Sequence, residues 1–302
     1  MNMNIVSVYR MFPTEADCIA HLEKVRWNGT PICPYCRSDK TTPRPKESRH
    51  HCNNCNTTFS VTVGTIFHHT HLDLQKWFLA ITLILNAKKG LSARQLARDL
   101  EVNKNTAWYL AMRIRKAMDE STERPLLEGI VEMDEKYVGG KPRKQNPNKN
   151  DGEGQANKPK RGRGTKKIPV VGMVQRDGDL AAKVVADKPL NNKTLSALVR
   201  SHVDIKSAVL VTDQYPGYIG IARIMEHETV NHQVWYVDGY RHTNTLESFW
   251  ALLTRGIIGQ YHKVSLRHLP KYVNEFSYRW NHRKNTDGLF ALTLERGLGV
   301  IA

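Results

Sequence analysis

The sequence lacks the long apolar segments of membrane and secreted proteins. Its longest apolar stretch, Trp77 to Leu85, is far too short to span a bilayer. The first residues (MNMNIVSVYRMFPTEADC) lack the continuous apolar core of a secretory signal. There are only five cysteines, and Cys18 stands apart from the other four, so a framework of disulfides fits poorly. We therefore expect a soluble protein of a reducing compartment, the cytoplasm.

Acidic residues are comparatively scarce. The chain has 45 Lys and Arg against 29 Asp and Glu, which gives a net charge of +16 and a sequence pI near 9.7. Such an excess predicts a polyanionic partner, of which nucleic acid is the commonest. A basic solubilising surface, or attraction to anionic lipid, would explain the same charge. The basic residues lie beside the DNA-reading motifs described below, and this favours nucleic acid.

Composition divides the chain into three parts. The 302 residues suffice for two or three folded units, and 40% hydrophobic residues with six tryptophans indicate globular packing. Residues 1–68 hold the cysteines and several prolines. Residues 69–122 contain a helical stretch that has no Pro and one Gly. Residues 123–302 alternate between strand-like and helix-like segments, so we expect an α/β domain there.

One tract inside the third part has no apolar side chains to bury. Residues 141–167 are rich in Lys, Arg, Asn, Gly and Pro, with no Leu, Ile, Val or aromatic residue. Such a segment cannot offset the entropy lost on ordering, so we expect a disordered basic insertion. A plain flexible linker and a loop that lies against phosphates both fit this composition.

Four cysteines form two closely spaced pairs, Cys33-Pro-Tyr-Cys36 and Cys52-Asn-Asn-Cys55, with fifteen residues between them. Two such pairs predict one structural Zn2+ held by four thiolates. The Thr, Phe and Val residues that follow favour short strands beside the metal. Two redox-active pairs are the alternative, but neither pair lies in a βαβ context. Four protein ligands leave no place for water, so the site should be structural.

The middle part resembles a helix-turn-helix. Residues 72–85 have helical spacing, and Ser92 can cap a following helix that buries Leu96 and Leu100. Residues 101–103 make the turn before a second helix. Its outward side would present the residues that we expect to meet a major groove and its phosphates: Lys104, Asn105, Trp108, Arg113 and Arg115. An ordinary helical hairpin with a basic solvated face is the alternative.

Three carboxylates follow a regular order in the last part. Asp134 closes the first apolar strand, Asp213 closes the fourth, and Glu247 lies in the first turn of a later helix that Asn244 or Thr245 could cap. Three strands, a helix, a strand, a helix, a short strand and a helix are the layout of an α/β RNase H-like domain. The first and fourth strands are neighbours in that fold, so these carboxylates would form a site for hard divalent cations such as Mg2+ or Mn2+. Taken singly, each acid could be a turn residue or a favourable charge at a helix start.

These motifs resemble those of bacterial insertion-sequence DDE transposases with an N-terminal zinc ribbon, which are related to the Merlin elements. The resemblance covers nearly the whole chain. It rests on CPYC and CNNC, on MDEKYVGGK around Asp134, on VTDQYPGY around Asp213, and on RHTNTLESFWALLTRGIIGQYHKVS around Glu247. Asp213 and Glu247 have 33 residues between them, close to the spacing usual for DDE enzymes.

The resemblance implies a bacterial, nucleoid-associated enzyme whose partner is double-stranded DNA. It would bind the terminal inverted repeats of its own element, cleave at the element ends and join the 3′ ends to target DNA by two-metal phosphoryl transfer. Joining two ends suggests a homodimer or higher oligomer. Some relatives use Asn as the third catalytic residue, which makes Asn244 the rival of Glu247. We prefer Glu247, because an anionic oxygen suits Mg2+ better than an amide, and assign Asn244 to DNA contact.

The sequence departs from the family in one place. Family members often carry Lys seven residues after the Glu, where this chain has Thr254 followed by Arg255. We expect Arg255 to contact DNA in its stead. Two other functions compete with the transposase: a structure-specific nuclease of the same fold, and a domesticated or inactive transposase that only binds DNA. The nuclease leaves the zinc ribbon without a purpose, and the DNA-binding protein leaves the carboxylates without one.

Overall fold

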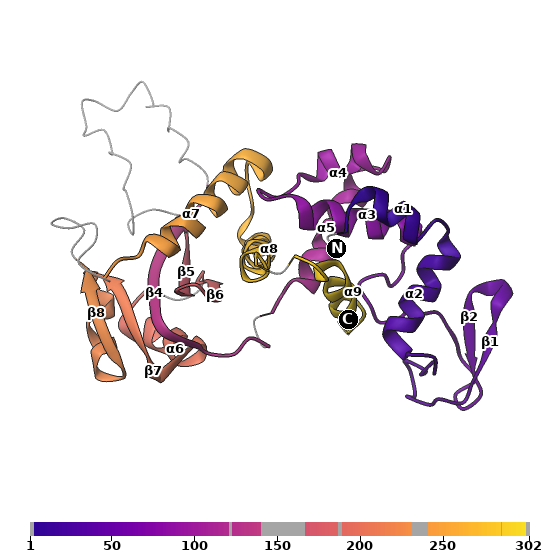
Figure 1. The fold of residues 1–302 in the computed structure, drawn as a ribbon, viewed down its shortest axis with the longest axis horizontal. Helices are drawn as coiled ribbons and strands as arrows, with labels where there is room; N and C mark the ends of the chain where they lie inside the picture. The colour runs from indigo at the N-terminus through magenta and orange to yellow at the C-terminus, as the bar shows by residue number, and fades with distance from the viewer. Residues whose placement is uncertain are drawn as a thin grey trace, which may run out of the picture. The chain divides into compact units, whose positions relative to one another are not determined.

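The computed structural model describes residues 3–120, 123–139, 167–186, 189–230, 241–284 and 286–299. The predicted insertion 141–167 lies outside the described residues, apart from Lys167. The chain divides into two compact units, one made of Met1–Glu120 and His282–Ala302 and the other of Ser121–Asn281 (Figure 1). In the described part of the chain, no helix is both long and apolar enough to cross a membrane.

The first unit combines helices with a small three-stranded sheet. Its helices and strands are α1 (Ile5–Met11), α2 (Glu15–Trp27), β1 (Thr41–Arg44), β2 (Arg49–Cys52), β3 (Thr58–Phe59), α3 (Leu74–Asn86), α4 (Ala93–Asp99), α5 (Lys104–Ala117) and α9 (Leu289–Gly299). The sheet is antiparallel in the order β1-β2-β3, as expected for a hairpin between two cysteine pairs.

Helix α9 packs within the first unit, whereas the sequence prediction placed residues 123–302 in one domain. It contacts α2, α3 and α5. The carbonyl of Gly297 accepts a hydrogen bond from Ile66 N (3.0 Å), and a Cβ at Gly297 would lie 2.8 Å from the Ile66 Cδ1 atom. The Arg296 Nε atom donates to the carbonyl of Ala117 at 2.8 Å. The apolar face of this helix therefore completes the core of the helical unit.

The second unit is built on a five-stranded mixed sheet with the order β6-β5-β4-β7-β8 (Figure 1). The elements are β4 (Leu127–Val138), β5 (Ile168–Gln175), β6 (Leu180–Val184), α6 (Asn192–His202), β7 (Val203–Asp213), a 3-10 helix (Pro216–Arg223), β8 (Glu226–Val230), α7 (Asn244–Gly256) and α8 (Leu269–Asn281). The first three strands are antiparallel, and β7 lies parallel to β4. The predicted RNase H-like order, with the first and fourth strands adjacent, is confirmed.

Side chains alternate between the two faces of this sheet. One face packs against α6 and the 3-10 helix through residues such as Val131, Met133 and Leu210. The other face packs against α7 and α8 through residues such as Val170 and Val174.

Candidate metal sites and nucleic-acid interface

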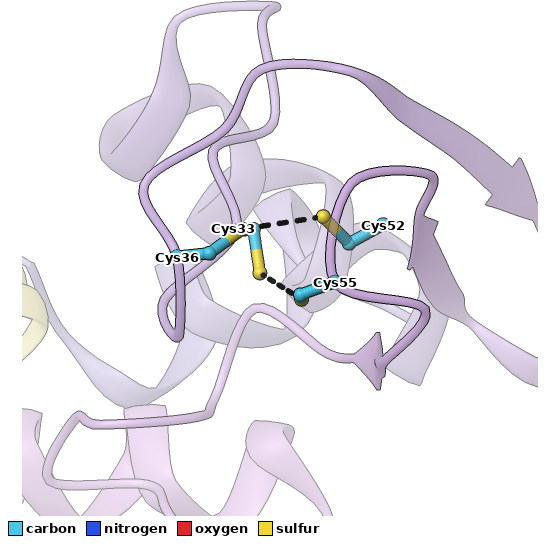
Figure 2. Close-up of side chains that lie close together, drawn as sticks. All are labelled: Cys33, Cys36, Cys52 and Cys55. Atoms are coloured by element: carbon cyan, nitrogen blue, oxygen red, sulfur yellow. Dashed lines mark hydrogen bonds between the residues drawn. The ribbon is translucent and has the colours of Figure 1, made fainter.

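The four cysteines converge on one point. Their sulfur atoms all lie within 4.8 Å of one another, with Sγ–Sγ distances of 3.7 Å for Cys33 and Cys55 and 3.5 Å for Cys36 and Cys52 (Figure 2). Thiolates about 2.3 Å from a tetrahedral zinc ion would be separated by about 3.8 Å. The sulfur geometry therefore fits a structural zinc ion, as the sequence predicts.

Protonation of these thiols depends on their surroundings. Burial raises the pKa of Cys33 to about 11. A backbone hydrogen bond from Ser38 lowers the pKa of Cys36 to about 6. A divalent cation at the centre favours the thiolate of every ligand, so metal binding and deprotonation are linked here.

Asp134 and Asp213 come from neighbouring parallel strands. The register between β4 and β7 pairs Met133 with Thr212, so the next residue on each strand is one of these aspartates. Their side chains share the sheet face that α7 covers, since Met133 points to the opposite face. The sequence predicts that Asp134 closes the first strand, but β4 and its pairing with β5 continue to Val138. Only the pairing of β4 with β7 ends here, at Met133.

Asp134 lies in an environment that disfavours its negative charge. Burial, then the charges of Glu135 and Asp213, raise its pKa to about 7. The indole Nε1 atom of Trp250 donates a hydrogen bond to Asp134 Oδ2 at 3.0 Å, which acts in the opposite direction. Carboxylates of this kind are suited to a hard divalent cation, which would relieve the repulsion between them.

Glu247 lies on α7, one turn before Trp250, and its side chain is exposed. Trp250 packs closely against the sheet because Gly172, opposite Asp134 on β5, has no side chain. Among the described residues, the cysteines form the only group of three or more potential ligands whose ligand atoms all lie within 4.8 Å of one another. The structure thus brings the two aspartates side by side and leaves Glu247 on the flank of the covering helix.

The neighbours of Glu247 on α7 are also exposed. Asn244 is the first residue of the helix, and Arg255 is exposed near its end, with Nε donating to the carbonyl of Ala251 at 3.0 Å. The predicted cap differs: Thr243 precedes the helix, and neither Asn244 nor Thr245 occupies the cap position. Both Asn244 and Arg255 are accessible to a ligand on this side of the helix.

Glu132 is a polar residue of this face that sequence reasoning missed. Its side chain is completely buried, yet it accepts hydrogen bonds from Leu246 N (3.0 Å), Thr245 Oγ1 (2.9 Å) and Arg176 Nε (2.9 Å). The alternation of the strand gives the signal: Glu132 precedes Asp134 by two residues and must share its face.

A second missed pair lies on the opposite face. The hydroxyl of Tyr218 donates to Glu135 Oε2 at 2.7 Å, and burial together with Glu135 raises the pKa of this phenol well above its usual range. Glu135 therefore points away from Asp213 and Asp134, in agreement with the alternation along β4.

The helix-turn-helix segment has the predicted elements. Ser92 caps α4 by accepting from Gln95 N at 3.2 Å, and Leu96 and Leu100 are buried. In α5, Lys104 and Asn105 are exposed at the helix start, as predicted. The exposed side of α5 also carries Trp108, Tyr109 and Lys116.

Two residues of α5 that the sequence predicts as DNA contacts do not lie on its exposed side. Arg115 is only 2% exposed, because it follows buried Ala111 by one helical turn and so lies on the inner side. Arg113 is half-buried and donates to the backbone carbonyls of His68 (2.5 Å) and Thr65 (3.2 Å). Its guanidinium also lies 5.2 Å from the ring centre of Tyr109. The structure thus gives both arginines contacts inside the unit.

Comparison with known proteins gives consistent matches. A family model described as "ISXO2-like transposase domain" matches residues 126–281, and one described as "Transposase zinc-ribbon domain" matches residues 13–58. A protein of Halobacterium salinarum, described as "Uncharacterized protein in transposable element ISH50", is 30% identical over 283 residues, which are 89% of this chain and 92% of that protein.

Solved structures give weaker matches. The Mos1 strand transfer complex is 13% identical, covers 73% of this chain and 78% of its own, and has a TM-score of 0.29. A pre-cleavage Mos1 transpososome is 14% identical, with shares of 72% and 78% and a TM-score of 0.29. Similarity at this level carries no argument about the present chain.

Proposed function

The chain belongs to the family of ISXO2-like transposases that carry a transposase zinc ribbon, and from this premise we propose that it cleaves DNA at the ends of its own element and joins the 3′ ends to target DNA. The observation that carries the proposal is the pair of aspartates, Asp134 and Asp213, side by side on the sheet face that α7 covers. Glu247 on α7 is the proposed third carboxylate.

Each proposed catalytic residue has a distinct task. Asp134 and Asp213 would hold divalent metal, and Glu247 would complete the ligand set from α7, with Asn244 as its alternative. Mg2+ or Mn2+ bound there would lower the charge on the phosphate and favour the oxygen nucleophile. The chain itself orients Asp134, since the Trp250 indole donates a hydrogen bond to its Oδ2 atom. Burial of this aspartate excludes water from one side of the site.

The proposed DNA interface combines separate parts of the chain. Lys104 and Asn105 at the exposed start of α5 would contact the element end, and Arg255 on α7 would contact DNA close to the carboxylates. The net charge of +16 supports a polyanionic partner. Pairing of two element ends would require at least a homodimer, acting at the nucleoid.

The test uses the purified full-length chain, Mn2+ or Mg2+, and a duplex that carries the element's own end sequence. We expect strand cleavage and strand joining, and we expect Asp134→Asn and Asp213→Asn to abolish both while DNA binding persists. Cleavage of branched DNA without joining would instead identify a structure-specific nuclease. Binding of the ends with neither reaction would identify a DNA-binding protein derived from a transposase.

A further inference from the structure

The start of helix α7 is attached to the sheet by a buried carboxylate. Glu132 Oε2 accepts from the backbone N of Leu246, which is the third residue of the helix. Thr243, the residue at the cap position, makes no side-chain capping hydrogen bond. The helix therefore takes a cap from a strand that is more than a hundred residues away in the sequence, in addition to the hydrogen bond from Asn244 N to His242 Nδ1 at 3.4 Å.

Further contacts secure the same end of the helix. Thr245 donates its hydroxyl to Glu132 Oε1 at 2.9 Å. Arg176 donates from Nε to Glu132 Oε1 at 2.9 Å and from a terminal nitrogen to the carbonyl of His242 at 3.0 Å. One buried carboxylate thus connects β4, the turn after β5 and the segment that enters α7. A completely buried acid with several donors around it holds these groups in fixed positions.

Helix α7 is attached to β4 at two points, and the distance between these points is about the same along the strand and along the helix. Glu132 and Asp134 are two residues apart on β4, about 6.6 Å along the strand. Their partners Leu246 and Trp250 are four residues apart on α7, about 6 Å along the helix axis. The helix is therefore fixed at two points in register with the strand, and Glu247 lies between them.

We propose that Glu132 is a positioning residue that sets the place of Glu247 opposite Asp134 and Asp213 and so determines metal affinity. This inference rests on the proposed function, since it assigns these three carboxylates to one metal site. Glu132 itself is too enclosed by its donors to be a metal ligand. It acts through the helix that it caps.

The test compares variants of the full-length protein with the wild type by Mn2+ binding, measured by electron paramagnetic resonance of the free ion. In Glu132→Gln, an amide NH2 replaces one acceptor oxygen and faces a donor. We expect Mn2+ affinity to fall roughly 10- to 100-fold, as for other groups that orient metal ligands. Hydrogen exchange in the first turn of α7 should rise in parallel.

A matched control separates positioning from loss of stability. Glu275 is also completely buried and accepts from Tyr261 and from Arg279, but it lies on α8. We expect Glu275→Gln to lower the unfolding temperature and to leave Mn2+ affinity within about twofold. If Glu132→Gln does not fold, Thr245→Val removes one donor, and Thr245→Ser keeps it. We then expect the valine variant to bind Mn2+ more weakly than the wild type and the serine variant to keep wild-type affinity.

The outcomes distinguish this inference from the proposed function. Wild-type protein that binds no Mn2+ at Asp134, as judged against Asp134→Asn, would overturn both. Wild-type binding that Asp134→Asn abolishes and Glu132→Gln leaves unchanged would overturn the positioning role alone. Equal losses in Glu132→Gln and Glu275→Gln would also overturn it, because a general loss of stability would then explain the effect.

Discussion

The raised pKa of Asp134 predicts how the stability of the second unit depends on pH. Burial and the neighbouring charges of Glu135 and Asp213 raise this pKa from 3.8 to about 7. The folded chain therefore holds this proton more tightly than the unfolded chain. Protonated Asp134 stabilises the fold below pH 4, and ionisation progressively destabilises it as the pH rises through about 7. Asp134→Asn removes this dependence, because the amide does not ionise.

The size of the effect follows from the shift. A change from 3.8 to about 7 is about three pH units, which corresponds to a ceiling of about 4 kcal/mol at 1.36 kcal/mol per unit. Asp134 is not completely buried, and water at its open side reduces the cost of the charge. We therefore expect the free energy of unfolding of Asp134→Asn, relative to that of the wild type, to rise by roughly 2–4 kcal/mol between pH 4 and pH 8.

Hydrogen exchange is the suitable assay, since a chain of two units need not unfold in a single step. Peptides of β4 and β5 are followed between pH 5 and pH 8 in wild type and Asp134→Asn, with correction for intrinsic exchange rates. The buffer contains no added divalent metal and no chelator, so that the zinc ribbon keeps its metal. Peptides of α3 and α5 in the other unit serve as an internal control.

We expect β4 and β5 to be better protected from hydrogen exchange in Asp134→Asn than in the wild type, by a difference that grows with pH. In the control helices this difference should stay constant. A difference that is the same at pH 5 and pH 8 would refute the reasoning, because Asp134 would then have an ordinary pKa. A difference that shrinks with rising pH would show that neighbouring donors stabilise the ionised form. Added Mn2+ should reverse the loss of wild-type stability above pH 7, since the cation favours the carboxylate.

Four further predictions concern packing, zinc, DNA binding and a buried arginine. Gly172→Ala places a Cβ 2.8 Å from atoms of Trp250, so we expect a loss of roughly 1–3 kcal/mol in urea unfolding and weaker Mn2+ binding, whereas an unchanged variant would contradict the close packing. Cys52→Ser should reduce bound zinc, measured by atomic absorption, from about one ion per chain and expose the hairpin to protease. Lys104→Ala should weaken DNA binding and reduce the salt slope by about one. Arg115→Ala should instead lower stability by roughly 2–4 kcal/mol and leave the salt slope unchanged; a reduced slope would show that Arg115 reaches a phosphate.

Much of both units could be predicted from local pattern. The cysteine spacing determines a four-sulfur site whatever the rest of the chain does, and the sulfur distances agree with it. Alternating apolar strands in the order seen here lead to adjacent first and fourth strands, which brings Asp134 beside Asp213. Both predictions depend on residues that are close in the sequence or on a rule of topology.

Long-range packing could not be predicted in the same way. Helix α9 follows the catalytic segment in the sequence, but its apolar face is complementary to α2, α3 and α5, and no local pattern specifies that choice. The sequence predicts Arg115 on the outer side of α5, and arginine is mostly exposed in proteins, whereas its helix position one turn after Ala111 determines that it is buried. In each case a tertiary contact overrides the tendency of the residue type.

Glu132 shows how the two kinds of information combine at the sheet face that α7 covers. The sequence places it two residues before Asp134, and strand alternation then requires both carboxylates on one face, beneath a helix. A carboxylate there is costly unless it meets several donors, and the first turn of a helix offers free backbone N–H groups. The pairing of Glu132 with Leu246 N satisfies both needs at once. It follows that a strand carrying a buried acid and a candidate metal-binding acid at alternate positions carries information about where its covering helix must begin.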